Sequence, residues 1–152
     1  MASLSSLLRL RRHPRTADRG RGAPAPLPPA RPLRERVGHA GEAAAIRHLE
    51  QQGYKILARD WRNRLGQIDI VAEDANTLVL VEVKARRGTA FGTPQEAVDA
   101  RKQRKLRTLL EVYRATTHRR EQPCRIDVVA LLLDDGLKVT QVEHIKDAVQ
   151  GE

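Results

Sequence analysis

The chain has one cysteine, Cys124, and aromatic residues make up only 3% of it. A single cysteine excludes an intrachain disulfide, so nothing in the sequence points to an oxidising compartment. No apolar run approaches the roughly 20 residues that a membrane-spanning helix needs, so we expect a soluble, cytoplasmic protein with no membrane partner. Because aromatics are scarce, the core must be built from Leu, Val, Ile and Ala.

Histidine and cysteine spacings typical of zinc sites are also missing. The chain has neither two cysteines separated by two residues nor two histidines separated by three to five residues. A metal bound by this chain is therefore expected to have carboxylate oxygens as ligands. The five histidines are His13, His39, His48, His118 and His144.

The net charge of +9 is spread unevenly. Residues 1–37 contain nine Arg against Asp18 and Glu35, a net charge of +7, which leaves +2 for residues 38–152. The same segment holds six of the eight prolines, which predicts a disordered basic extension. Its acid-free, Ser- and Arg-rich start leaves an organellar transit peptide as an alternative. The charge therefore says little about whether the folded domain, predicted at residues 38–152, binds nucleic acid.

Hydrophobic periodicity predicts alternating helices and strands from Gly38 onward. A helix–strand–strand–strand–helix–strand–strand order makes the third and fourth strands parallel neighbours, because a helix connects them. We therefore predict an α/β fold with a mixed central sheet flanked by helices. Thr93, Pro94 and Glu96 resemble the start of a capped helix. The predicted helices cover residues 38–52 and 93–117, and the strands cover residues 54–61, 67–73, 77–85, 125–133 and 137–144.

The third predicted strand carries charged residues where a buried strand should be apolar. Because side chains alternate along a strand, Glu82 and Lys84 lie on one face, about 7 Å apart. Asp69 lies in the preceding strand, and the short turn between them predicts an antiparallel hairpin in which Asp69 approaches Glu82. Glu42 shares a helix face with Ile46. Together these residues form a candidate catalytic site.

Such a site suits phosphodiester hydrolysis. Carboxylates such as Asp69, Glu82 and Glu42 can hold Mg²⁺ or Mn²⁺, which polarises a phosphate and acidifies a water molecule. The ammonium group of Lys84 can position that water and stabilise the charge of the transition state. The alternative is a row of acidic and basic side chains on a solvent-exposed sheet face. The apolar surroundings of Glu82 weaken that alternative.

Several motifs, taken together, resemble a known family. They are GHAGE (38–42), RNRLGQIDI (62–70), VLVEVKAR (79–86), FGTPQEAV (91–98) and RIDVV (125–129). Over about residues 38–142 the chain resembles the bacterial YraN family of uncharacterised proteins. That family is similar to the restriction-endonuclease-like superfamily of Asp…(Asp/Glu)-x-Lys nucleases and to archaeal Holliday-junction resolvases.

The resemblance implies an αβββαβ core in which Glu42, Asp69, Glu82 and Lys84 fill the active positions. One departure is Gln67, where the family usually has Glu. Gln67 should share a strand face with Asp69, so a secondary ligand or hydrogen bond there is expected to differ.

The second predicted helix and its exit are strongly basic. Residues 101–120 contain eight Arg and Lys against Glu111 alone. Such a face can contact phosphates without reading sequence, although a solvated amphipathic face explains it equally well. The residues that we expect at the nucleic acid are Arg86, Arg87, Arg101, Lys102 and Lys105.

Three functions follow as hypotheses. The first is a Mg²⁺-dependent nuclease acting on DNA rather than RNA, with branched or junction DNA as a candidate substrate. Cleavage of both strands at a junction would favour a homodimer. Association of a cytoplasmic protein with the nucleoid would fit a DNA substrate. The second is a non-catalytic nucleic-acid-binding protein with a nuclease-like fold, and the third is an interaction scaffold that uses residues 1–37. Asp127, inside an apolar strand, is either a site residue or part of a buried ion pair.

Overall fold

A computed structural model describes residues 25–92 and 98–149. The chain divides into two compact units, Met1–Ala30 and Arg31–Glu152. Residues 25–30, the described part of the first unit, have no regular secondary structure. The second unit contains α1 (Leu33–Gln51), β1 (Lys55–Asn63), β2 (Gly66–Asp74), β3 (Thr77–Arg87), α3 (Ala100–Thr116), β4 (Cys124–Leu133) and β5 (Val139–Ile145).

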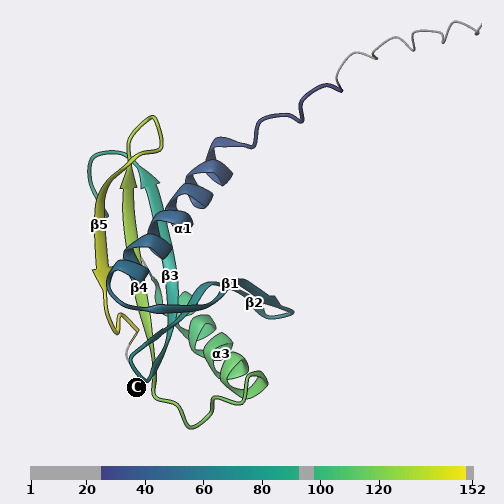
Figure 1. Ribbon diagram of the computed structural model, residues 1–152, viewed down its shortest axis with the longest axis vertical. Helices are drawn as coiled ribbons and strands as arrows, with labels where there is room; N and C mark the ends of the chain where they lie inside the picture. The colour runs from purple at the N-terminus through teal and green to yellow at the C-terminus, as the bar shows by residue number, and fades with distance from the viewer. Residues whose placement is uncertain (1–24, 93–97, 150–152) are drawn as a thin grey trace, which may run out of the picture. The chain divides into compact units, whose positions relative to one another are not determined.

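The described strands form one mixed sheet in the order β1-β2-β3-β4-β5 (Figure 1). Strands β3 and β4 are parallel, and the other neighbouring pairs are antiparallel. The predicted α/β class, the element order and the parallel pair are therefore confirmed. This is the arrangement of an αβββαβ endonuclease-like core with one further strand.

Both faces of the sheet are covered by apolar side chains, as the strand periodicity predicts. Val79 and Val81 of β3 pack in a cluster with residues of α1, among them Leu49. Leu78 and Leu80 of the same strand pack in a second cluster with residues of α3. Because β3 is buried on both faces, a charged side chain on this strand is costly to bury unless it is paired.

Helix α1 begins five residues before the predicted start, at Leu33. Pro32 precedes the first helical residue, and Glu35 pairs with Arg31 and His39, each four residues away. Such pairs at helical spacing stabilise a first turn. The neighbouring prolines and Gly38 suggested a later start, but Gly38 lies inside the helix.

Helix α3 begins later than predicted, at Ala100. Asp99 is its N-cap, and its Oδ1 accepts a hydrogen bond from the Lys102 backbone N–H at 2.8 Å. Val98 and Asp99 are not helical, so a single helix from 93 to 117 is wrong. Asp is a stronger N-cap than Thr. The predicted cap residues Thr93, Pro94 and Glu96 lie outside the described residues.

No helix in residues 25–92 or 98–149 combines the length and apolar composition needed to cross a membrane.

Candidate functional site

The sheet divides at the point where Asp69 and Glu82 lie. Pairing between β2 and β3 runs from Asp74↔Thr77 to Ile70↔Val81 and stops there. Beyond that point β2 pairs only with β1, while β3 continues beside β4 to its last residue. Asp69 and Glu82 are the next residues on the two separating strands. The predicted convergence of these two carboxylates therefore comes from the end of the β2–β3 ladder.

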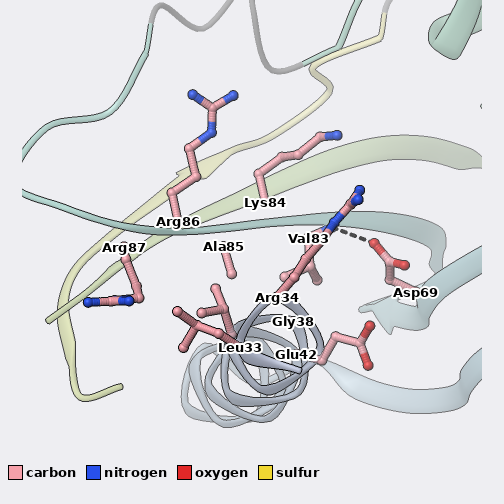
Figure 2. A pocket seen from close by; sticks show the side chains of 11 residues that line it. Leu33, Arg34, Gly38, Glu42, Asp69, Val83, Lys84, Ala85, Arg86 and Arg87 are labelled. Carbon is pink, nitrogen blue, oxygen red and sulfur yellow. Dashed lines mark hydrogen bonds between the residues drawn. The ribbon is translucent and has the colours of Figure 1, made fainter. Parts of the chain in front are cut away.

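Asp69 spans the gap between the separating strands. Its Oδ2 accepts a hydrogen bond of 2.8 Å from the Val83 backbone N–H, drawn as a dashed line in Figure 2. The carboxylate thus replaces the acceptor that a paired strand would offer to Val83. The second oxygen of Asp69 is free of this bond and can contact a ligand. Asp69 therefore has a structural role, through this hydrogen bond, that does not depend on any catalytic function.

The pKa of Asp69 is raised from 3.8 to about 6. Burial is the largest cause, and the negative charges of Glu82 and Glu42 add to it. The bond from Val83 and the charge of Lys102 act in the opposite direction. A buried carboxylate with two further acids close to it forms a place where a cation would be stabilised.

Glu82 is almost fully buried, at 5% exposure. Its Oε1 lies 3.4 Å from the Nζ of Lys84 and 3.2 Å from the Nζ of Lys102. Two ammonium groups therefore compensate one buried carboxylate, which would otherwise be costly to bury. Lys102 was expected at the nucleic acid, and the structure places its ammonium group beside Glu82. No local pattern reveals this contact, because it depends on how α3 packs on the sheet.

Glu42 approaches the same site from α1. It lines one cavity with Asp69, and Figure 2 shows both carboxylates on the same side of β3 as α1. Its pKa is raised by burial and by the charge of Asp60, against the effects of His39 and Arg62. The predicted set therefore lies in one region, with Glu42 and Asp69 lining the cavity and Glu82 buried beside it.

The cavity has a volume of about 640 Å³ and lies between α1 and the last residues of β3. Lys84, Arg86 and Arg87 line it, as does Arg34. Arg87 also forms an ion pair with Asp135. Arg34 was missed by sequence reasoning, because it was placed in the disordered extension.

Three other predicted residues lie elsewhere. Arg101 and Lys105 do not line this cavity, although both are exposed. The side chain of Lys105 covers the turn at Gly66. Gln67 is exposed and pairs with Arg62 of β1.

The alternation that would place Gln67 beside Asp69 is interrupted in the structure. Ile68 packs in the cluster of α3, whereas Ile70 packs in the cluster of α1. Asp60, between the β1 partners of these two residues, has φ +47°. The kink in β1 and the twist of β2 therefore decide where Asp69 points.

The donor chemistry suits Mg²⁺ or Mn²⁺ with few protein ligands. Within residues 25–92 and 98–149, no group of three or more His, Cys, Asp or Glu side chains has the spacing to hold a metal ion. Mg²⁺, however, keeps several waters and needs only one or two carboxylates. Asp69 and Glu82 supply hard oxygen donors of that kind, and Glu42 lines the same cavity as Asp69.

Asp127 forms a buried ion pair, one of the two roles expected for it from the sequence. It has 0% exposure, and its Oδ1 accepts from Arg125 Nε and from the Asp147 backbone N–H, each at 2.9 Å. His144 Nε2 lies 2.9 Å from its Oδ2. Burial alone would raise the pKa of Asp127, but the bonds from His144 and Arg125 hold it below its usual value. This network ties β4 to the chain after β5.

The element order and the mixed sheet are those of a restriction-endonuclease-like α/β domain. Residues 41–131 match the model of "Uncharacterised protein family UPF0102", so the chain belongs to that family. This family corresponds to the resemblance inferred from the sequence.

Three relatives illustrate the match, and each is described as a UPF0102 protein. The protein of Symbiobacterium thermophilum is 52% identical over 97 residues, which is 64% of this chain and 82% of the relative. That of Moorella thermoacetica is 47% identical over 115 residues, or 76% and 96% of the two chains. That of Rhodococcus opacus is 42% identical over 112 residues, or 74% and 94%.

Proposed function

We propose that this protein is a Mg²⁺- or Mn²⁺-dependent nuclease that hydrolyses phosphodiester bonds in DNA. One observation carries the proposal: Asp69 and Glu82 lie next to each other where β2 and β3 separate, and burial together with the charge of Glu82 raises the pKa of Asp69 to about 6. In a row of charges on a solvent-exposed sheet face, Glu82 would be exposed. Glu82 is instead buried, which is costly for a carboxylate.

Asp69 and Glu82 are the proposed metal ligands, with Glu42 as a third contact. Bound there, Mg²⁺ would supply positive charge at the scissile phosphate and acidify a water molecule. The hydrogen bond from Val83 fixes the orientation of the Asp69 carboxylate. This fixed orientation lowers the cost of ordering the carboxylate when a ligand binds.

Lys84 is the proposed water-positioning and charge-stabilising residue. Its Nζ lies 3.4 Å from Glu82 Oε1, on the side of β3 opposite α1 (Figure 2), and the residue borders the cavity along the strand. From this position an ammonium group can donate hydrogen bonds to a water molecule and to a phosphate oxygen. Lys102 is a positioning residue, because its Nζ lies 3.2 Å from the same Glu82 oxygen, Oε1.

The decisive experiment compares cleavage by the full chain and its Asp69→Asn variant. Plasmid, flap and four-way-junction DNA are incubated with Mg²⁺, with Mn²⁺ and with EDTA. Asn can still accept the bond from Val83, so the variant should fold normally and yet lose about 100-fold or more in rate, on the scale of one lost electrostatic group at an active site. Glu121→Gln, which changes an exposed carboxylate outside the site, is the matched control.

Metal-dependent cleavage that Asp69→Asn abolishes and Glu121→Gln preserves supports the proposal. No cleavage of any of these substrates by the parent protein, or equal cleavage by Asp69→Asn, contradicts it. Cleavage of RNA in preference to DNA would correct the substrate. Cutting of two strands at the junction would support a homodimer, and the DNA substrate fits a protein of the cytoplasm and its nucleoid.

A second function, non-catalytic nucleic-acid binding, is favoured by one observation. Two ammonium groups already neutralise Glu82, so its burial is explained without a metal. On this hypothesis DNA binding is salt-dependent and survives Asp69→Asn and Glu82→Gln unchanged or strengthened. Absence of cleavage together with such binding would select it over the nuclease.

A further inference from the structure

Helix α1 and the end of β3 diverge, and their divergence opens the cavity beside Asp69. At Gly41 the two elements are in close contact, because a Cβ there would lie 2.3 Å from the Cβ of Ala85. One turn earlier, a Cβ at Gly38 would meet no atom within 4 Å. Gly38 lines the cavity, so the lack of a side chain there leaves the cavity open.

The β3 side of the cavity is an unpaired sheet edge. From Glu82 onward β3 has β4 on one side and no strand on the other among the described residues. The Val83 N–H points to that open side, toward Asp69. Backbone N–H groups alternate along a strand, so those of Ala85 and Arg87 point to the same open side. Backbone N–H groups of this kind commonly donate to phosphate oxygens.

Charge changes sign along the cavity. Arg34, Gly38 and Glu42 are four residues apart and lie on one helix face, so Arg34 is about 12 Å from Glu42 along the axis. On β3, the side chains of Lys84 and Arg86 point to the side of the strand opposite α1 (Figure 2), so they do not reach into the groove. Helix α1 therefore carries an acid at the site and an arginine a few nucleotides away. Within the described residues, Arg34 is exposed and forms no ion pair with a carboxylate.

The remaining lining is apolar. Leu33 and Val37 of α1 face the cavity together with Ala85 of β3. A volume of about 640 Å³ is that of a pocket for a small-molecule-sized ligand, whereas a bound duplex typically covers about 1,000–2,500 Å² of protein surface. The cavity thus fits a single nucleotide of an unpaired strand, with its base against the apolar wall and a phosphate at Arg34.

We propose that the groove between α1 and the free edge of β3 binds an unpaired segment of a nucleic-acid strand, with Arg34 holding a phosphate. The choice of nucleic acid as the ligand rests on the proposed function. The groove delivers the strand to Asp69 and Glu82, so the preferred substrate is a flap, an overhang or the unpaired arm of a branch. Continuous duplex does not enter the groove.

Filling the groove tests this inference directly. The full chain carrying Asp69→Asn, in which cleavage is switched off, is titrated by fluorescence anisotropy into a duplex with a single-stranded overhang and into a blunt duplex of the same sequence. Overhang DNA should bind about tenfold more tightly than blunt DNA. Adding Gly38→Leu should remove that preference, whereas Gly38→Ala should keep it. Leu is a good helix former, and a Cβ at this position meets no atom within 4 Å, so the variant should fold, which circular dichroism checks.

An arginine variant tests the phosphate contact separately. Arg34→Ala should weaken overhang binding about threefold to tenfold and lower the dependence of log affinity on log salt by about 0.7. Arg36→Ala removes an exposed arginine from the same helix that does not line the cavity. It should leave both quantities unchanged.

Equal binding of overhang and blunt DNA, or an undiminished preference in Gly38→Leu, overturns the inference. A poly-glutamate peptide that binds as tightly as the overhang, and loses binding in Gly38→Leu, would also overturn it and assign the groove to an acidic peptide strand.

The two proposals fail separately. Groove-dependent overhang binding without cleavage by the parent would contradict only the nuclease, and metal-dependent cleavage with an unaffected Gly38→Leu would contradict only the groove.

Discussion

Two glycines of α1, three residues apart, should respond in opposite ways to the same substitution. Gly38→Ala and Gly41→Ala each add one methyl group to the same helix. In a helix interior, alanine is more favourable than glycine by about 1 kcal/mol. Gly38 has open space around it, so this gain should appear in full as an increase in the free energy of unfolding.

At Gly41 the methyl group meets β3. The new Cβ would lie 2.3 Å from Ala85 Cβ and 3.9 Å from Val83 Cγ1. The Ala85 methyl cannot rotate away, so the helix or the strand must move. Overpacking of this kind costs roughly 1–3 kcal/mol, which exceeds the helical gain. We expect Gly41→Ala to lose about 1 kcal/mol, a difference of about 2 kcal/mol from Gly38→Ala.

Urea unfolding followed by circular dichroism measures these differences, and thermal unfolding should separate the two variants by several degrees. Ala85→Gly in the Gly41→Ala background removes the clashing methyl group. The double-mutant cycle should then give a coupling of about 1–3 kcal/mol. If Gly41→Ala stabilises the protein as much as Gly38→Ala does, the close approach of α1 and β3 is wrong. The boundary drawn for the groove would then be wrong as well.

The remaining predictions concern buried charge and pH. Because the pKa of Asp69 is raised to about 6, the native state binds the extra proton, and the free energy of unfolding should fall as pH rises from about 4 to 6. Asp69→Asn should therefore stabilise the metal-free protein at pH 7 and have little effect below pH 4, as thermal melts at both pH values would show. Asp127→Ala leaves Arg125 buried without its main partner and should cost about 3–5 kcal/mol in urea unfolding. Glu73→Ala, which breaks a more exposed ion pair, should cost at most about 1 kcal/mol; equal losses would contradict the buried network. The pKa of His48 is lowered by burial and by His144. The contribution of His48 to stability, opposite in direction to that of Asp69, should therefore be lost as pH drops below about 6.5, and His48→Gln should remove this contribution in pH-dependent melts.

Much of the fold could be predicted from local patterns. The apolar alternation of β3 predicted two packed faces, and Val81 and Leu80 do lie in opposite clusters. The helix between β3 and β4 predicted a parallel pair, which the register confirms. Element ends were less accurate: α1 starts at Leu33 and α3 at Ala100, because pairs between side chains and a cap at Asp99 outweigh the glycine and proline signals.

The sequence also identified the acids and Lys84 of the candidate site, because charged residues inside apolar segments are visible without a structure. It could not show that Lys102 pairs with Glu82, since that contact joins residues of α3 and β3 that no local pattern relates. Nor could it show that Asp69 bonds to the Val83 backbone, since the bond exists only because β2 and β3 separate at that residue.

The sequence by itself therefore determined the α/β class, the family and the residue types of the site. Those properties depend on periodicity and composition, which act over a few residues. The tertiary structure alone decided the cavity, the place of Arg34 beside it and the partners of Glu82. Those depend on where α1 meets β3 at Gly41 and where it diverges at Gly38, and such distances between elements are set by packing across the whole domain.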